Sequence, residues 1–404
     1  MTDVEVYLDT GGRTSIVGTA RILRLRGVDT TEFTYDDGFL AGRGWEISPD
    51  LPIAQGRAVL QGLPGALLDS APDAWGRNLI VRRAAARARE AGHVSPTLTE
   101  ADHLLGVADS TRQGALRFRL AGEGPYLAEG TEVPQLVDLA TLLDAATRVA
   151  ENSDAHDAVE TLLDAGSGSL GGARPKASVS DAAVLYVAKF PHPLDRWDIM
   201  RWEAVALDLA EACGLRTPAR RLLDIGGAAV LLVERFDRVD GRRIPYLSGQ
   251  SLVGAEVGAR CDYLQLAEAL TTHGSDVTAD LEELWRRIAF SVAVNNTDDH
   301  MRNHGALRSK GGWTLSPVFD VNPDPNPAAR RMTSISGATA PQACLEALFQ
   351  MASAFDLGEA EATAHWRDLV AVTSGWRRYA SDRGINDAEQ AEFAPVLDRW
   401  SATV

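Results

Sequence analysis

One stretch in the C-terminal half places the strongest constraint on the fold: an amphipathic helix runs directly into a loop rich in Asn and Asp. Apolar residues recur at helical spacing over 281–294, which predicts a helix with one buried face. Residues 295–303 then read Asn-Asn-Thr-Asp-Asp-His-Met-Arg-Asn, and weak β-like segments follow at 305–307 and 313–315. Polar groups at the end of a buried helix are either an ordinary Asx-rich turn or side chains held in place for chemistry.

The sequence predicts an α+β architecture built from three parts. Residues 1–135 are β-rich to about residue 60 and then helical, which defines an N-terminal α/β module. Residues 136–245 contain a predicted helix over 137–165 and two strongly β-like segments, and residues 246–404 are almost entirely helical by pattern. At roughly 150 residues per domain, a chain of 404 residues suits two or three such parts.

Composition disfavours several classes of protein. The formal net charge of −16 disfavours direct, sequence-independent binding of nucleic acid by the whole chain. Cys213, Cys261 and Cys344 are far apart, so we expect a reducing compartment and neither a disulfide framework nor a cysteine-rich zinc site. No apolar run is long enough for a membrane span and the N-terminus is unlike a signal peptide, so we expect a cytoplasmic protein.

Asp298, Asn303 and Asp320 are the residues best suited to chemistry. A carboxylate followed five positions later by an asparagine is the spacing of the protein-kinase catalytic loop, in which the carboxylate orients a hydroxyl and the amide oxygen ligates a metal. Phe319-Asp320 resembles the metal-binding Asp of the kinase DFG element, although Val321 replaces the glycine. Asn303 and Asp320 together suit a hard divalent cation whose shell is completed by phosphate oxygens.

A second pair of candidates lies in the middle of the chain. Lys189 ends the apolar segment 184–190 and resembles the phosphate-pairing lysine of kinases, with Glu203 on the next helix as its expected partner. Both have ordinary alternatives, a strand-end lysine that reaches solvent and a first-turn glutamate favoured by the helix dipole.

Two connections are candidates for contact with a nucleotide. The Gly/Ser-rich loop 166–176 precedes a β-like segment, which is the wrong order for a dinucleotide fold, and it lacks the Gly-Lys-Ser/Thr of a Walker A loop. It is either a loop whose backbone N–H groups approach phosphates or a flexible linker. The segment 232–238 leaves the second β-like stretch and either offers backbone groups to an adenine edge or is a charged strand end.

His300 and His304 are four residues apart, as two zinc ligands on a helix would be. No HExxH glutamate accompanies them, and turn-forming residues surround them. We therefore expect no zinc site here, and we expect His300 to brace the loop through hydrogen bonds.

Taken in order, these segments resemble the HipA family of serine/threonine kinases, the toxin components of bacterial toxin–antitoxin pairs. The resemblance rests on GARPK (172–176), VAKFP (187–191), VERFDR (233–238), NNTDDHMRN (295–303) and SPVFD (316–320). The Asp-x-His-x-x-Asn form of the loop is shared with the phosphoinositide-kinase branch of the kinase-like fold. VYLD, ISPDLP and LLDSAPDAWGR extend the resemblance into the N-terminal module, so that it covers most of the chain.

The resemblance implies a two-lobed protein-kinase-like fold, with the N-lobe in 136–245 and the catalytic and metal-binding loops in 246–404. It implies ATP and Mg²⁺ as cofactors. The residues it assigns are the catalytic Asp298, the magnesium ligands Asn303 and Asp320, Lys189 with Glu203 at the phosphates, Glu234 and Phe236 at the adenine hinge, Gly171, Gly172 and His300 around the nucleotide, and Ser169 as the serine whose autophosphorylation silences the enzyme. Arg174-Pro175 replaces a more common Gln-Glu pair, which bears on autoregulation more than on catalysis.

The resemblance also implies partners. Family members bind a small helix-turn-helix antitoxin of the HipB type, which contacts operator DNA in place of the acidic kinase, and an aminoacyl-tRNA synthetase is a candidate protein substrate. Two alternatives stay open. One is a small-molecule or lipid kinase on the same fold, because the phosphate-donor residues are shared, and the other is a non-catalytic scaffold that binds an antitoxin.

Overall fold

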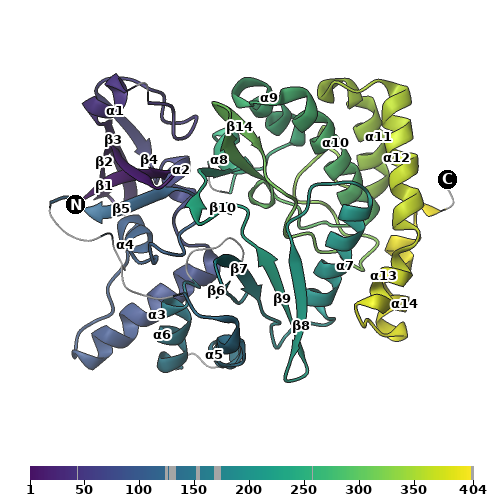
Figure 1. Cartoon of the computed structure of the whole chain (residues 1–404), viewed down its shortest axis with the longest axis horizontal. Coiled ribbons are helices and arrows are strands. Elements are labelled where there is room, and N and C mark those ends of the chain that lie inside the picture. The colour runs from purple at the N-terminus through teal and green to yellow at the C-terminus, as the bar shows by residue number, and fades with distance from the viewer. Residues whose placement is uncertain are drawn as a thin grey trace. The chain divides into compact units, whose positions relative to one another are not determined.

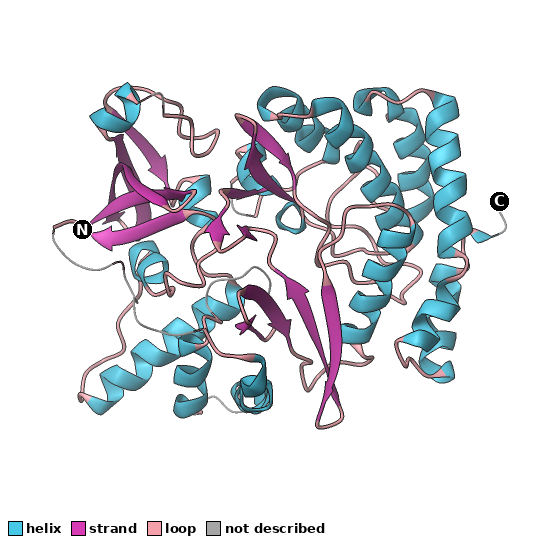
Figure 2. Ribbon diagram, viewed as in Figure 1, coloured by secondary structure: helices cyan, strands magenta, loops and turns pink. Residues whose placement is uncertain are grey.

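The computed structural model describes residues 1–42, 44–122, 126, 133–151, 155–167, 174–256 and 258–401. The chain forms two compact units: unit 1 comprises Met1–Leu194 and Leu223–Leu247, and unit 2 comprises Asp195–Leu222 and Ser248–Val404. Most strands lie in unit 1, and unit 2 is mainly helical (Figures 1 and 2).

The first sheet of unit 1 is antiparallel, with its strands in the order β4-β3-β2-β1-β5. Its strands are β1 (Thr2–Thr10), β2 (Arg13–Leu25), β3 (Val28–Tyr35), β4 (Arg57–Gln61) and β5 (Leu116–Leu120), and the short helices α1 (Asp37–Ala41), α2 (Gly65–Asp69) and α4 (Glu100–Leu105) lie in the connections. Val4, Val6 and Leu8 are buried and alternate with more exposed residues, because successive side chains of a strand face opposite sides of the sheet. The β-rich start predicted from this alternation is confirmed.

The second sheet has the strand order β6-β7-β9-β8 and is packed against helices of the same unit. Its elements are β6 (Lys176–Asp181), β7 (Val184–Lys189), β8 (Arg220–Ile225) and β9 (Ala228–Glu234), with α3 (Ala74–Glu90), η1 (Leu136–Asp138), α5 (Leu139–Glu151) and α6 (His156–Asp164) around the core. Leu79 of α3, Leu162 of α6 and Val230 of β9 are fully buried in that core. The short strands β10 (Arg238–Val239) and β11 (Arg242–Arg243) follow β9.

Unit 2 is built around α10, whose Leu284, Trp285 and Ile288 are fully buried. Its helices are α7 (Ile199–Ala212), α8 (Gly249–Val253), α9 (Tyr263–His273), α10 (Val277–Ala293), α11 (Pro341–Gln350), η3 (Ala352–Phe355), α12 (Glu359–Thr373), α13 (Trp376–Asp382) and α14 (Asp387–Leu397). The predicted strand pair is confirmed as β13 (Gly305–Ser309) and β14 (Gly312–Leu315), and a sheet of order β12-β13-β14 adds β12 (Tyr246–Ser248).

One prediction about an individual element is wrong, and one strand was not predicted. The single helix expected over 137–165 is divided, because Ala155, with a ψ of 65°, precedes α6 outside the helical region. The strand β6 has no counterpart among the predicted β-like segments, and five of its six residues are buried.

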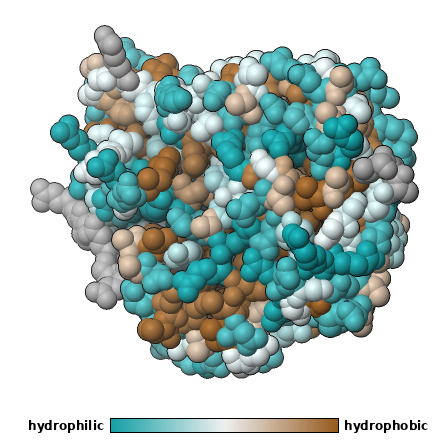
Figure 3. Space-filling model, turned by 45° about the vertical axis from the view of Figure 1, so that its right-hand side comes forward, coloured by the Kyte–Doolittle hydropathy of each residue, from teal (hydrophilic) through white to brown (hydrophobic). Residues whose placement is uncertain are grey.

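Charged residues make up 24% of the chain. Figure 3 shows a face on which hydrophilic residues predominate and apolar residues gather near the lower edge. In the part of the chain that the structure describes, no helix has both the length and the apolar composition needed to cross a bilayer.

Candidate active site

The loop that follows α10 carries the catalytic candidates. The helix ends at Ala293, and Asn295 then adopts a left-handed backbone conformation with a φ of 55°, which asparagine tolerates better than most residues. The Asn295 side chain donates hydrogen bonds to the carbonyl oxygens of Asp324 and Asn326 at 2.6 and 3.2 Å. This turn redirects the chain out of the buried helix and fixes the start of the loop to the segment that follows Asp320.

The two adjacent aspartates of this loop have opposite environments. Asp298 is exposed, whereas Asp299 is only 4% exposed. Four side chains bond the Asp299 carboxylate: His304 Nε2 at 2.9 Å, the Ser291 hydroxyl at 2.8 Å, the Arg331 guanidinium at 3.0 Å, and the Tyr263 hydroxyl. Asp299 therefore anchors the loop to α9, α10 and the Arg331 segment, and its neighbour Asp298 is left accessible.

Electrostatics keep this anchor charged. Burial opposes the negative charge of Asp299, but His304 and Arg331 outweigh it and hold the pKa of Asp299 well below its ordinary value. Burial raises the pKa of Tyr263 well above its ordinary value, so its hydroxyl stays a neutral donor. Arg331 also donates to the backbone oxygen of Asn296 at 2.9 Å, which ties the charged pair to the loop backbone.

Asn303 lies beside Asp298, as the five-residue spacing predicts. It ends the one-turn helix η2 (Met301–Asn303), and its Nδ2 donates to the backbone oxygen of Asp298 at 3.1 Å. That bond uses the nitrogen of the amide, so the amide oxygen is the atom suited to a cation.

Asp320 lies on a segment next to the loop that carries Asp298. Its φ of 58° is rare for a residue with a Cβ, and such strained conformations concentrate at functional sites. Downstream, the Asn322 N–H donates to Asn296 Oδ1 at 3.4 Å. A cavity of about 20 Å³, room for about one water, is lined by Asn303 and by Phe319 and Val321, which flank Asp320. The structure thus brings together the two segments that carry the predicted metal ligands.

The residues present fit a bound polar group. Nδ1 of His300 and Oδ1 of Asn322 are buried and have no hydrogen-bond partner among the described residues, which is unusual for buried polar atoms. Carboxylate and amide oxygens, as on Asp320 and Asn303, are the donors that Mg²⁺ prefers. Within the described ranges no three His, Cys, Asp or Glu residues converge.

His304 makes a bracing hydrogen bond in the loop, because its Nε2 atom lies 2.9 Å from Asp299 Oδ1. The prediction that His300 braces the loop is not supported at its Nδ1 atom, which lacks a partner in the described part of the chain.

In unit 1, the structure brings Lys189 and the predicted hinge onto adjacent strands. Lys189 ends β7 and pairs in register with Leu231 of β9, and Glu234 at the end of β9 lies opposite Tyr186. Beyond Glu234, the ring centroid of Phe236 is 6.2 Å from that of Tyr246. The strand ends therefore carry the candidate phosphate lysine and the candidate hinge on one sheet.

Other predicted residues are not brought together by these contacts. Glu203 is 1% exposed in α7 of unit 2, whereas Lys189 is in unit 1, so their pairing stays a prediction. Ser169, Gly171 and Gly172 lie outside the described residues.

Sequence analysis missed four residues that hold the loop and considered His304, the fifth, only as a zinc ligand; the four are Asp299, Ser291, Tyr263 and Arg331. The second carboxylate of the Asp-Asp pair was the one available signal. Tyr263 and Arg331 are 36 and 32 residues away from Asp299, and no local pattern marks them.

Comparison with protein families gives two matches. The description "HipA N-terminal domain" fits residues 14–95, and "HipA-like C-terminal domain" fits residues 168–376. Among curated proteins none matches the chain.

Solved structures are similar over most or part of the chain. The HipA chain of the Shewanella oneidensis MR-1 HipA, HipB and operator DNA complex has a TM-score of 0.69 at 15% identity, covering 99% of this chain and 96% of that one. The Helicobacter pylori proinflammatory kinase CtkA has a TM-score of 0.37 at 13% identity, covering 56% of this chain and 93% of that one. Streptococcus pneumoniae choline kinase LicA has a TM-score of 0.24 at 16% identity, with coverages of 58% and 92%. The first similarity bears on the fold, and it confirms the predicted two-lobed, kinase-like α+β fold.

Proposed function

The chain belongs to the HipA family, and from that membership and the geometry around Asp298 we propose that it is an ATP-dependent serine/threonine protein kinase of the HipA toxin type. The observation that carries the proposal is that an exposed Asp298 and Asn303 share one loop, which the buried Asp299 anchors. Phosphoryl transfer needs little covalent chemistry from the protein and much positioning. An anchored loop with an accessible carboxylate supplies that positioning.

Asp298 is the proposed residue that orients the attacking hydroxyl and accepts its proton. In the proposed step, the oxygen of a protein serine or threonine forms a bond to the γ-phosphorus of ATP, and the bond from that phosphorus to the β–γ bridging oxygen breaks. ADP leaves with the bonding electron pair, and Asp298 accepts the hydroxyl proton. The exposure of Asp298 allows a protein side chain to reach it, whereas the buried Asp299 is already fully bonded.

Asn303 and Asp320 would hold Mg²⁺, which when bound neutralises charge on the β- and γ-phosphates. The remaining proposed contacts to ATP are Lys189 at the phosphates with Glu203 to orient it, the backbone of Glu234 and Phe236 at the adenine, the backbone N–H groups of Gly171 and Gly172 at the phosphates, and His300 through its unpartnered Nδ1 atom.

We also propose that Ser169 is phosphorylated by the enzyme itself. A phosphoserine carries up to two negative charges and three acceptor oxygens, which would compete with ATP phosphates for the same cations. Intact-mass and peptide mass spectrometry after incubation with ATP test this, and an active enzyme with unmodified Ser169 would exclude it.

The proposed partner is a small helix-turn-helix antitoxin of the HipB type. Support comes from the Shewanella oneidensis HipA, which was solved with HipB and operator DNA. The net charge of −16 favours contact with DNA through such a partner, and a cytoplasmic location would suit it. A protein substrate such as an aminoacyl-tRNA synthetase follows from the family resemblance alone.

Asp298→Ala tests the proposed function. Transfer of radiolabel from [γ-³²P]ATP to protein should be abolished, while the melting temperature stays within about 2 °C, because an exposed loop carboxylate contributes little to packing. Asp144→Ala is a matched control, since the Asp144 side chain is 69% exposed on α5 and has no proposed catalytic role. Near-wild-type transfer by Asp298→Ala rejects the assignment.

The same assay separates the two alternatives. Label in a metabolite or lipid pool and none on protein would indicate a small-molecule or lipid kinase. ATP with Mg²⁺ that fails to raise the melting temperature of the wild-type chain would indicate a non-catalytic scaffold.

A further inference from the structure

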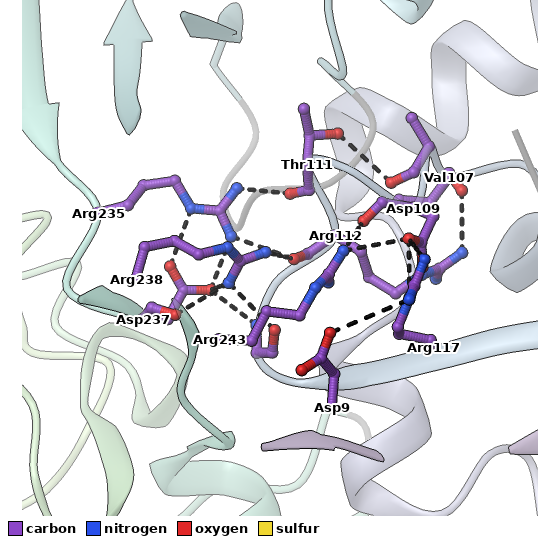
Figure 4. Close-up of polar contacts among 12 residues, drawn as sticks. Asp9, Val107, Asp109, Thr111, Arg112, Arg117, Arg235, Asp237, Arg238 and Arg243 are labelled. Atoms are coloured by element: carbon purple, nitrogen blue, oxygen red, sulfur yellow. Dashed lines mark hydrogen bonds and ion pairs between the residues drawn. The ribbon is translucent and has the colours of Figure 1, made fainter. Parts of the chain in front are cut away.

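A buried network of arginines and aspartates joins two distant segments of unit 1 (Figure 4). One is the segment Asp109–Gly114, which follows α4, and the other is the stretch that leaves β9 at the predicted hinge. The side chains of the network are Asp9, Asp109, Arg112, Arg117, Arg235, Asp237, Arg238 and Arg243. All of them belong to one compact unit, so the contacts are internal to it.

On the hinge side, Arg235 is the central donor. Its guanidinium donates to the backbone oxygens of Thr111 and Arg112 at 2.5 and 3.2 Å, and to the Asp237 carboxylate at 2.9 and 2.7 Å. Asp237 in turn accepts the backbone N–H of Gly114 at 2.7 Å. The side chains of Arg235 and Asp237 are 2% and 4% exposed, so the hinge segment is bonded to the Asp109–Gly114 segment without competition from water.

The Asp109–Gly114 segment is itself rigidly held. Arg112 is 1% exposed, and it donates to the backbone oxygens of Ser70, Leu104 and Val107 at 2.7, 3.0 and 2.9 Å. Burial lowers the pKa of Arg112 to about 9, so the side chain remains charged at neutral pH. A buried charge that satisfies three carbonyls tolerates little displacement.

The same segment also contacts the start of the predicted Gly/Ser loop. Gly166 is the first residue of that loop and has a φ of 66°. A Cβ atom added to Gly166 would lie 2.3 Å from the Thr111 hydroxyl oxygen and 2.6 Å from Thr111 Cβ. The backbone of Thr111 therefore bonds the hinge while its side chain touches the loop.

The other end of the loop is fixed close to the same place. Lys176 Nζ donates to Asp73 at 2.7 Å, and both side chains are at most 4% exposed. Asp73 also caps α3 by accepting the N–H of Gly76 at 2.6 Å. Because Arg112 bonds the oxygen of Ser70, three residues before Asp73, the anchors of both loop ends are tied to each other.

We propose that the Asp109–Gly114 segment is a positioning element of the nucleotide site, which couples the ends of the Gly/Ser loop to the hinge Glu234–Arg238. A displacement of the loop start moves Thr111, and through the Thr111 carbonyl it moves Arg235. The role in nucleotide binding rests on the proposed kinase function, whereas the mechanical coupling is a property of unit 1 alone. The N-terminal module would then set the affinity for ATP without touching it.

Gly166→Ala perturbs the start of the Gly/Ser loop, and the effect is then measured at the hinge Glu234–Arg238. Truncating a buried arginine risks unfolding, so the added methyl group is the gentler change. Without nucleotide, amide hydrogen exchange in peptides that cover residues 234–245 should become about tenfold faster in this variant. A tenfold effect lies within the usual range of coupling between two sites in a protein. In the kinase assay, KM for ATP should rise about tenfold while kcat stays within about twofold of the wild-type value. This combination indicates weaker binding of ATP with the chemical step unaffected.

Gly92→Ala is the matched control. Gly92 has a φ of 69°, so the backbone strain is the same, but nothing lies within 4 Å of an added Cβ. It should leave hinge exchange and KM unchanged. Thr111→Gly combined with Gly166→Ala removes all three clashing atoms and should restore the slower hinge exchange.

If hydrogen exchange at the hinge is unchanged in a folded Gly166→Ala variant, the coupling is overturned, even where the chain proves to be an active kinase. A wild-type chain that does not bind ATP overturns the proposed function instead, whatever the hinge does. Should Gly166→Ala fail to fold, Arg235→Lys provides the reverse measurement, because linkage is reciprocal. Exchange of residues 159–167 should then quicken, and protection equal to that of the wild type overturns the proposal.

Discussion

Replacing Asp299 with asparagine should destabilise unit 2 far more than the size of the change suggests. The substitution preserves shape but removes the negative charge opposite Arg331, and the two residues are only 4% and 5% exposed. Breaking a buried ion pair by removing one partner costs about 3–5 kcal/mol, because the remaining charge stays buried without compensation. Three further donors, from His304, Ser291 and Tyr263, would face a neutral amide that accepts through only one oxygen.

Urea unfolding monitored by tryptophan fluorescence measures this cost. The matched control is Asp368→Asn, since Asp368 pairs with Arg367 where the side chains are 71% and 64% exposed, and an exposed pair is worth less than about 1 kcal/mol. Tyr263→Phe deletes the hydroxyl that donates to the same carboxylate and accepts from Arg331, and because both partners are charged it should cost about 1.5–3 kcal/mol. If Asp299→Asn costs no more than the exposed control, the buried charge does not hold the catalytic loop and the reasoning is refuted.

Three further outcomes are expected. Against the opposing effect of burial, His304 and Arg331 hold the pKa of Asp299 below its ordinary value, and Arg235 and Arg238 do the same for Asp237. The stabilisation from both carboxylates is therefore complete above about pH 4 and is lost as the pH falls through the folded-state values. Urea midpoints in acid should show this loss, less steeply in Asp237→Asn. Leu284→Ala in the core of unit 2 should cost about 2–5 kcal/mol in the same assay, whereas Val137→Ala at an 88% exposed position should stay within about 0.5 kcal/mol. Burial raises the pKa of Cys213 from 9.0 to about 12, so at pH 8 its thiolate fraction is about a thousandfold lower than in the unfolded chain. Its alkylation by iodoacetamide should be slower to match, and comparable rates in the folded and unfolded chain would contradict that burial.

The proximity of the candidate residues Asp298 and Asn303 was predictable because its signals are local. Asp298 and Asn303 are five residues apart in one loop, and a hydrogen bond of 3.1 Å indeed joins them. The periodicity of the helix before the loop and of the strand pair after it predicted where the loop would lie. Asp320 could be proposed as a metal ligand because it comes shortly after that strand pair.

The supporting part was not predictable, because burial of a charged residue leaves no mark in the neighbouring sequence. Arg330 and Arg331 are adjacent and chemically identical, yet Arg330 is exposed and Arg331 is 5% exposed at the centre of the Asp299 network. Lys176 is a similar case, since its partner Asp73 is 103 residues away. Tertiary contacts over such separations decide which charges are buried, and one sequence holds no record of them.

Both buried networks have the same construction. Asp299 follows the end of α10 and Asp237 follows the end of β9, and each pairs with an arginine that also donates to backbone oxygens, Arg331 to Asn296 and Arg235 to Thr111. A buried ion pair adds little net stability over a well-packed apolar replacement, but it makes every arrangement that separates the charges costly. Charged pairs at these two places therefore fix the path of a loop, and removal of one partner is costly because the other charge stays buried. A fixed path is what the proposed phosphoryl transfer requires, because the candidate catalytic and hinge groups lie on irregular segments.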